Sequence, residues 1–177
     1  MGIINSVISL VIMAIVAINM ASQPIIGFNY GAKSVSRVRE ALRISLIAAT
    51  LIAVGAFTFI EAIPGVIVKL FNSDSQQLYQ ISVKGLRLVI LAFPLVGFQV
   101  VANHFFHANK KSKIAMFITL FWQVIMLIPL LFILPGFLGI KGIWLAYPLA
   151  DSISALAVTF FLVREWRRLP GIVGEKA

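Results

Sequence analysis

The chain contains no cysteine among its 177 residues. Disulfide bridges, covalent attachment of a c-type haem and thiolate metal sites are therefore excluded. Its two histidines, His104 and His107, have no acidic residue nearby at metal-ligand spacing, and no glycine-rich phosphate loop ends in Lys-Ser or Lys-Thr. We therefore predict no metal site, no cofactor and no enzyme, and we expect both histidines to lie on the surface.

Charged residues are also scarce. They make up 12% of the chain against 60% hydrophobic residues, and the mean hydropathy is +1.01. Soluble domains contain about 25% charged and about 45–50% apolar residues, so the chain is predicted to be an integral membrane protein. A span needs about 20 mostly apolar residues, and such runs cover residues 3–26, 44–63, 85–106, 114–134 and 143–163.

These runs predict an all-α fold, a polytopic membrane helix bundle with five transmembrane helices. No composition shift, low-complexity tract or internal repeat marks a domain boundary. We therefore expect residues 1–170 to form one transmembrane lobe and residues 171–177 to be a cytoplasmic tail.

The net charge of +9 comes from basic residues that border the spans. Most of them follow the first, third and fifth spans: Lys33, Arg37, Arg39, Arg43, Lys110, Lys111, Lys113, Arg164, Arg167, Arg168 and Lys176. This alternation predicts, by the positive-inside rule, a multi-pass protein of the inner (plasma) membrane with its N-terminus outside and its C-terminus in the cytoplasm. Because no recognition module accompanies the charge, we expect no nucleic-acid partner.

Prolines lie inside or near the ends of several spans, at Pro94, Pro129 and Pro148. Each removes a backbone hydrogen bond, so we expect a kink at each position. The glycine-containing stretch from Pro135 to Gly142 is predicted to be a short outer loop between the fourth and fifth spans.

The end of the first span, residues 23–32, is unusually polar for a membrane helix. Lipid cannot satisfy exposed amide groups, so Gln23, Asn29 and the carbonyl freed by Pro24 should face protein or a water-filled cavity. Gly27 and Gly31 form a small-xxx-small pair, for which we expect close helix packing.

Several motifs together resemble the C-terminal lobe of the multidrug and toxic compound extrusion (MATE) family. They are Gln-Pro-Ile-Ile-Gly-Phe-Asn-Tyr-Gly-Ala at residues 23–32 with Arg37 after it, Leu86-Arg87, Ala92-Phe93-Pro94, Gly97-Phe98-Gln99, Phe105-Phe106, and residues 142–151. Members of that family have twelve helices in two lobes of six. The chain is similar to helices eight to twelve, a partial lobe without the seventh helix.

The resemblance implies part of a multidrug efflux antiporter. Such a protein exports cationic amphipathic compounds in exchange for sodium ions or protons as its two lobes rock about a central site. The implied partners are the lipid bilayer, small cationic organic substrates, and the missing N-terminal lobe and seventh helix. Two alternatives stay open: a lipid-linked sugar flippase of the same architecture, or a truncated, non-transporting remnant or assembly subunit.

Asp151 is the only carboxylate deep in a predicted span. Burying it costs about 2.5–3.5 kcal/mol, so it is either a site for the coupling sodium ion or proton or a structural group bonded to Ser152, Ser154 or a neighbouring helix. The family's best-known cation carboxylates lie on other helices, and the span resembling the tenth helix, residues 85–106, carries no acid. Many relatives have a basic residue beside the equivalent of Gln123, where this chain has Trp122.

Four polar residues are candidates to line a substrate cavity, the alternative being hydrogen bonds between helices. They are Gln23, Asn29, Gln99 and Asn19. Five residues are expected to shape the helices around them: Pro24, Gly27, Gly31, Pro94 and Pro148. Glu61 is expected to make a helix-end or gating contact at the outer rim.

Overall fold

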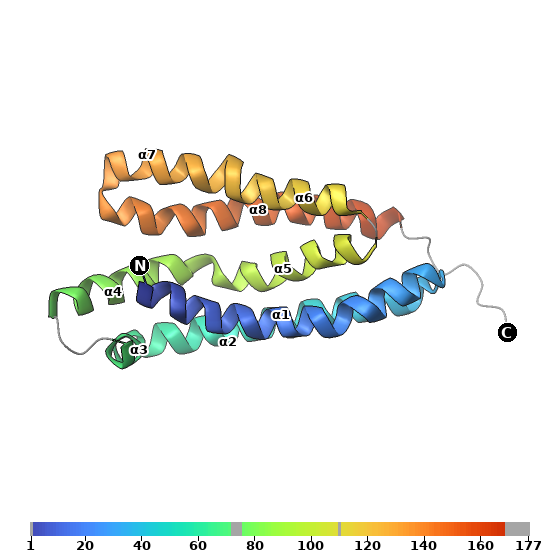
Figure 1. The fold of residues 1–177 in the computed structure, drawn as a ribbon, viewed down its shortest axis with the longest axis horizontal. Helices are drawn as coiled ribbons and strands as arrows, with labels where there is room; N and C mark the ends of the chain where they lie inside the picture. Colours follow the sequence, from blue (N-terminus) through green and yellow to red (C-terminus); the bar gives the residue numbers. More distant parts are fainter. Residues whose placement is uncertain (1, 72–75, 110, 169–177) are drawn as a thin grey trace.

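The computed structural model describes residues 2–71, 76–109 and 111–168, which are helical nearly throughout and contain no strand (Figure 1). The predicted residues 171–177 of the tail lie outside this described part. The helical elements are α1 (Gly2–Gly31), α2 (Val35–Ala62), α3 (Pro64–Phe71), α4 (Gln76–Val89), η1 (Ile90–Ala92), α5 (Phe93–Ala108), α6 (Ser112–Leu120), η2 (Phe121–Leu127), α7 (Ile128–Leu138) and α8 (Ile140–Arg168).

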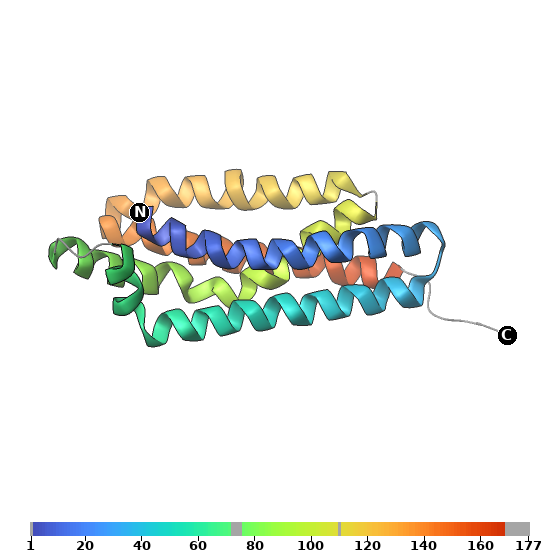
Figure 2. The same ribbon diagram turned by 60° about the horizontal axis from the view of Figure 1, so that its bottom comes forward.

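These elements form five rods that are long and apolar enough to cross a membrane, as the hydropathy predicts. Three rods are the single helices α1, α2 and α8, and the other two are α4 continued by η1 and α5, and α6 continued by η2 and α7. The rods run side by side and alternate in direction (Figures 1 and 2). The rods are longer than the apolar runs in the sequence, because the helices extend into the polar residues on either side. Helix α4, for example, begins at the polar residue Gln76.

Helix α5 is central, because it packs against α1, α2 and α8. Its contact with α2 is close at Gly97, where an added Cβ atom would lie 2.5 Å from the backbone oxygen of Ala49. Gly27 and Gly31 do not play this role: Gly31 has open space beside it, and a Cβ on Gly27 would make only an ordinary contact, 3.8 Å from the Ala108 backbone oxygen. The close packing expected at that pair is therefore wrong and occurs at Gly97 instead.

The rod formed by α6, η2 and α7 packs mainly on α8 and forms an outer layer of the bundle (Figure 1). A small core of Leu127, Ala146 and Ala150 lies between them. Helical geometry changes immediately before two prolines: η1 is a 3-10 turn ahead of Pro94, and η2 is π-helical ahead of Pro129. Pro148 and Pro24 lie within α8 and α1, which continue past them.

The outer loop predicted from Pro135 to Gly142 is wrong. Helix α7 continues to Leu138 and α8 begins at Ile140, so Gly139 alone forms the turn. Its φ of 57° and ψ of −140° belong to a region that glycine alone adopts without strain. A Cβ on Gly142 would collide with the backbone of Leu134, which shows how closely the two helix ends meet.

The basic segments lie together at one end of the bundle. The turn from α1 to α2, the turn from α5 to α6 and the end of α8 all reach this end (Figure 1). Which side of the membrane it occupies stays a prediction. Side-chain contacts join the helices there. Lys111 pairs with Glu165 of α8, and Arg39 of α2 donates a 3.3 Å hydrogen bond to the backbone oxygen of Trp166 and lies 5.3 Å from the centre of its ring.

Candidate functional site

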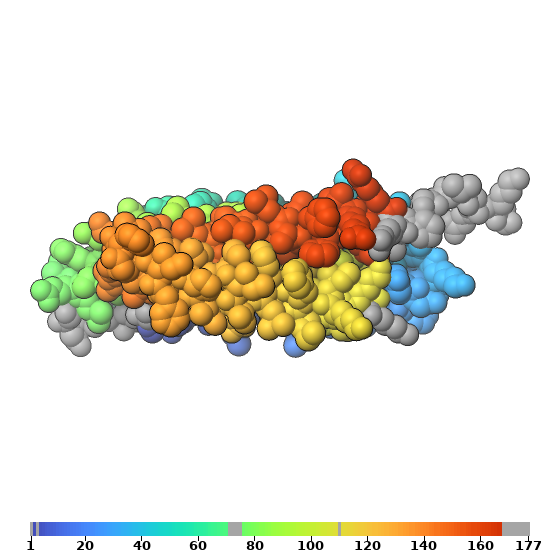
Figure 3. Space-filling model, turned by 90° about the horizontal axis from the view of Figure 1, so that it is seen from above, coloured from blue at the N-terminus to red at the C-terminus, as the bar shows by residue number. Residues whose placement is uncertain are grey.

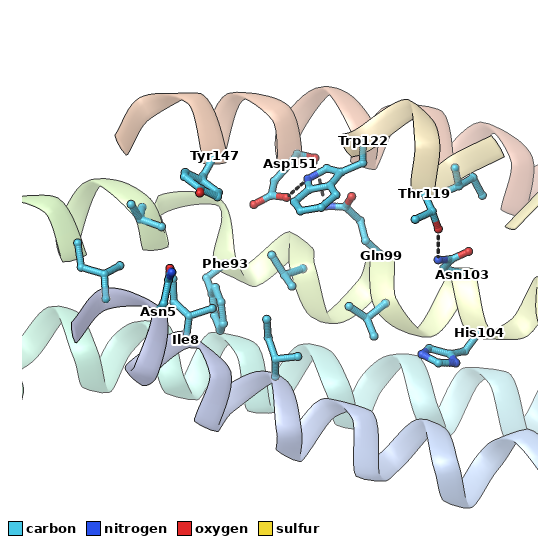
Figure 4. A pocket seen from close by; sticks show the side chains of 16 residues that line it. Asn5, Ile8, Phe93, Gln99, Asn103, His104, Thr119, Trp122, Tyr147 and Asp151 are labelled. Atoms are coloured by element: carbon cyan, nitrogen blue, oxygen red, sulfur yellow. Dashed lines mark hydrogen bonds between the residues drawn. The ribbon is translucent and has the colours of Figure 1, made fainter. Parts of the chain in front are cut away.

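A groove opens between α1, α5, the α6–η2 segment and α8 (Figure 4). Its volume is about 480 Å³. Aliphatic side chains form much of its wall, and the polar or aromatic lining residues are Asn5, Phe93, Gln99, Asn103, His104, Thr119, Trp122, Tyr147 and Asp151. The groove therefore combines an apolar wall with one carboxylate.

Asp151 projects from α8 into this groove. The indole Nε1 of Trp122 donates a 2.7 Å hydrogen bond to its Oδ1. The hydrogen bond from Trp122 is the one found to this carboxylate among the described residues, so its other oxygen is open to a ligand in the groove. Of the predicted structural partners, the two serines are wrong, because Ser152 donates to the backbone oxygen of Pro148 and Ser154 is buried without contact to the carboxylate. The partner comes from a neighbouring helix, which was the third alternative.

Trp122 reaches Asp151 from the π-helical segment η2. A π-helical stretch shifts the angular position of the residues that follow its start, and such stretches occur frequently at functional sites. Many relatives are expected to have a basic residue at this position. Trp122 offers a neutral N–H group, and no lysine or arginine of the described residues forms an ion pair with Asp151.

Gln99 ties the central helix to this carboxylate-bearing helix. Its Nε2 donates a 3.1 Å hydrogen bond to the backbone oxygen of Asp151. Gln99 and Asp151, two residues predicted as site candidates on different spans, thus lie together in the groove. One further cross-link follows along the groove, where Asn103 Nδ2 donates to the Thr119 hydroxyl at 3.0 Å (Figure 4).

One of the two histidines differs from its prediction as a surface residue. His107 is exposed, but His104 is half-buried and lines the groove near Asn103 (Figure 4). Asn103 was also missed, together with Asn5 and Thr119. The i, i+4 spacing of Gln99 and Asn103 places both on one face of a helix, and that spacing was the signal available in the sequence.

The other three cavity candidates lie away from the groove. Asn19 is buried and donates to the backbone oxygen of Ile15 at 3.0 Å, while its Oδ1 has no partner. Asn29 donates to the backbone oxygen of Ile25 at 2.8 Å. Gln23 is exposed, as is Pro24 beside it. A role for these residues in a substrate path stays a prediction.

The chemistry of the groove suits a cation with apolar groups. Aromatic rings of Phe93, Trp122 and Tyr147 stand on its walls, and ring faces attract cations. Asp151 supplies the negative charge, and no lysine or arginine is among the lining residues that the structure describes.

The family model MatE matches residues 1–133, which include four of the five rods almost completely. The chain belongs to the MatE family. This agrees with the resemblance found in the motifs at residues 23–32 and 86–99. No curated protein sequence matches the chain.

Solved MatE-family structures share the arrangement of helices. The MATE multidrug transporter DinF-BH is 33% identical, with a TM-score of 0.87 over 95% of this chain. An inward-facing multidrug resistance MATE family transporter of the MOP superfamily is 18% identical, with a TM-score of 0.85 over 94% of the chain. An outward-facing one is 19% identical, with a TM-score of 0.84 over 92%.

The chain spans 37% of DinF-BH, 39% of the inward-facing transporter and 37% of the outward-facing one. Because it matches the inward-facing and outward-facing structures about equally well, its five rods form a unit whose fold is common to both. The chain thus has the fold of part of a MatE-type transporter and is a multi-pass membrane protein.

Proposed function

We propose that the chain forms part of a multidrug efflux antiporter that exports cationic amphipathic compounds in exchange for sodium ions or protons. In this proposal the groove at Asp151 is the cation-binding site of this lobe, and the basic end of the bundle faces the cytoplasm. The observation that carries the proposal is the Asp151 carboxylate, which stands among aromatic and aliphatic side chains with one oxygen unbonded.

A single carboxylate is sufficient to couple two cations. Asp151 can neutralise an organic cation, a sodium ion or a proton, but the groove holds one carboxylate and hence one such charge at a time. Binding of the coupling ion therefore opposes binding of the substrate at this site. Mutual exclusion of this kind is the thermodynamic requirement for exchange when the site faces each side of the membrane in turn.

The charge of the groove lining argues against the alternative of a lipid-linked sugar flippase. A lipid-linked sugar carries a pyrophosphate, which calls for arginine or lysine side chains in the binding site. The groove instead presents a carboxylate and has no lysine or arginine among its described lining residues. This charge favours a cationic substrate over an anionic one.

The test is binding of radiolabelled tetraphenylphosphonium, an apolar organic cation, to the purified chain in detergent. We expect Asp151→Asn to weaken binding at least about tenfold, the effect of losing roughly 1.4 kcal/mol of charge attraction. Glu61→Gln is the matched control, because Glu61 lies outside the groove and pairs with Arg87. It should bind like the unaltered chain.

Coupling is tested in the same assay by adding sodium chloride or lowering the pH. Displacement of the probe from the unaltered chain by either cation, and its loss in Asp151→Asn, would support exchange at this carboxylate. Equal binding by the unaltered chain and Asp151→Asn would show that the groove carboxylate does not hold the cation.

A further inference from the structure

We propose that the end of α8 carries a second site, which binds an anionic phospholipid. In this site Arg164 and Arg167 hold the headgroup phosphate, and an acyl chain lies along the apolar outer face of the same helix. The site is separate from the groove at Asp151 and does not depend on the transport function.

A second hollow on the protein surface marks the position. It is lined by Thr159, Phe160, Val163, Arg164 and Arg167, all from α8 and all exposed. The two arginines are three residues apart, so their side chains lie on one face of the helix. Neither has a hydrogen bond or ion pair with another described residue, so both guanidinium groups are available to a ligand.

The residues between the two arginines face the other way. Glu165 is only 4% exposed and pairs with Lys111, and Trp166 packs against Arg39 of α2. Glu165 is the only acidic residue in the described part of α8 after Asp151, and its charge is already compensated. Arg164 and Arg167 therefore present an unneutralised pair of positive charges on the outer face.

An apolar stripe leads along α8 to these arginines. Its members recur every three or four residues and are exposed by 42%, 41%, 73%, 63% and 44%, in the order Leu149, Ile153, Leu156, Phe160 and Val163. Figure 3 shows the end of α8, in red, at the surface of the bundle face that α7 and α8 form. The stripe lies within a candidate span, so in this proposal it faces hydrocarbon and its last turn meets the headgroup region.

The combination identifies the occupant as a lipid. An occupant must present an apolar chain at the depth of Leu156 and Phe160 and a negative group at the depth of Arg164, which describes a phospholipid. Guanidinium groups bind phosphate oxygens through paired, charge-assisted hydrogen bonds. An anionic lipid such as phosphatidylglycerol is favoured over a zwitterionic one, because no choline or ethanolamine cation then opposes the arginines.

The test compares tryptophan quenching by brominated phosphatidylglycerol and brominated phosphatidylcholine in vesicles that contain the full chain. Trp166 lies between the two arginines in the chain, at the same level of α8 but on its inner side, and reports lipid bound at this end of the helix. Trp122 and Trp144 are replaced by phenylalanine in every sample, so that the signal comes from Trp166 alone. We expect the unaltered chain to prefer phosphatidylglycerol, and Arg164→Ala/Arg167→Ala to lower the preference about thirtyfold, the combined effect of two basic residues near an anionic surface.

The matched control is Arg37→Ala/Arg43→Ala. It removes the same charge from exposed positions at the same end of the bundle. We expect it to keep the preference. An equal loss in both double variants would overturn the proposal, because it would show a general attraction of the basic end rather than a site.

A charge-conserving variant keeps the test decisive if the alanine variant fails to fold. Arg164→Lys/Arg167→Lys retains both charges but loses the paired hydrogen-bond geometry of arginine, so we expect a partial loss of the preference. An unchanged preference in this variant would refute phosphate binding by the two guanidinium groups. Displacement of the brominated lipid by soluble glycerol phosphate would refute the role of the acyl chain.

Discussion

Trp122 and Asp151, 29 residues apart in the chain, are joined by a 2.7 Å hydrogen bond from the indole Nε1 to the carboxylate Oδ1. The bond links the π-helical segment of one rod to the middle of another. It fixes the carboxylate at the groove wall while leaving its second oxygen unbonded. The pair therefore has two separable properties: a contact that stabilises the fold and a charge that attracts a cation.

The first prediction separates these properties with Trp122→Phe. Phenylalanine keeps an aromatic ring in the groove but cannot donate the hydrogen bond. We expect the free energy of unfolding to fall by about 1.5 kcal/mol, since the partner is charged but can recruit water from the groove. Tetraphenylphosphonium should still bind, because Asp151 is intact.

Asp151→Asn should behave in the opposite way. Its amide oxygen can still accept the Trp122 bond, so stability is retained while cation binding is lost. Unfolding by a denaturing detergent and probe binding measure both quantities on each variant. Loss of binding in Trp122→Phe to the same degree as in Asp151→Asn would mean that the two side chains act as one binding unit.

The second prediction concerns the contact between α2 and α5. An added methyl group at Gly97 would press on the backbone of Ala49, which cannot rotate away. Gly97→Ala should lower the free energy of unfolding by about 1–3 kcal/mol, as overpacking does in other cores. Gly55→Ala is the control, because no atom lies within 4 Å of its added Cβ. A stable Gly97→Ala variant would show that the helices can separate without cost.

The third prediction concerns the buried ion pair of Lys111 and Glu165. The Glu165 side chain is 5% exposed and that of Lys111 is 30% exposed, so the two charges differ in their access to water. Lys111→Ala leaves a buried carboxylate alone and should cost about 3–5 kcal/mol. Glu165→Gln leaves a lysine that can reach water and should cost less. Thermal unfolding in detergent measures the order, and a larger loss in Glu165→Gln would contradict it.

The fourth prediction is a small effect. Glu61 and Arg87 approach to 3.3 Å at the opposite end of the bundle, with side chains 39% and 52% exposed. Exposed pairs contribute about 0–1 kcal/mol, so Glu61→Gln, Arg87→Gln and the double variant should all unfold near the midpoint of the unaltered chain. A double-mutant cycle yields the coupling energy, and a value well above this range would indicate a structural gate rather than a surface pair.

Hydropathy was sufficient to predict the five spans, because each apolar run exceeds the thickness of a bilayer. It could not predict the partner of Asp151. The two adjacent serines and a neighbouring helix were the candidates. The partner is on a neighbouring helix, but Trp122 reaches Asp151 through a π-helical segment that no local pattern in the sequence marked. The prediction of a loop from residue 135 to 142 was wrong because it treated proline and glycine as breaking the helix. Pro135 and Gly136 are compatible with the last turns of a helix in lipid.

The side of the helix on which each polar candidate lies determines whether it reaches the groove. Gln99 lies on the face of α5 that looks toward α8, so it meets Asp151. Asn19 and Asn29 instead satisfy their side-chain N–H groups on backbone oxygens one turn earlier in α1. The sequence shows which residues in the spans are polar. The direction in which each side chain points depends on how the helices are rotated about their axes in the bundle.

The one-residue turn at Gly139 has a consequence for biogenesis. With α7 ending at Leu138 and α8 beginning at Ile140, no free segment exists between these two spans to be threaded across the bilayer separately. We expect the two helices to enter the membrane together as a hairpin, whose apolar contact is made by Leu127, Ala146 and Ala150 in the folded state. In that case Asp151 enters the bilayer together with the segment that bears Trp122.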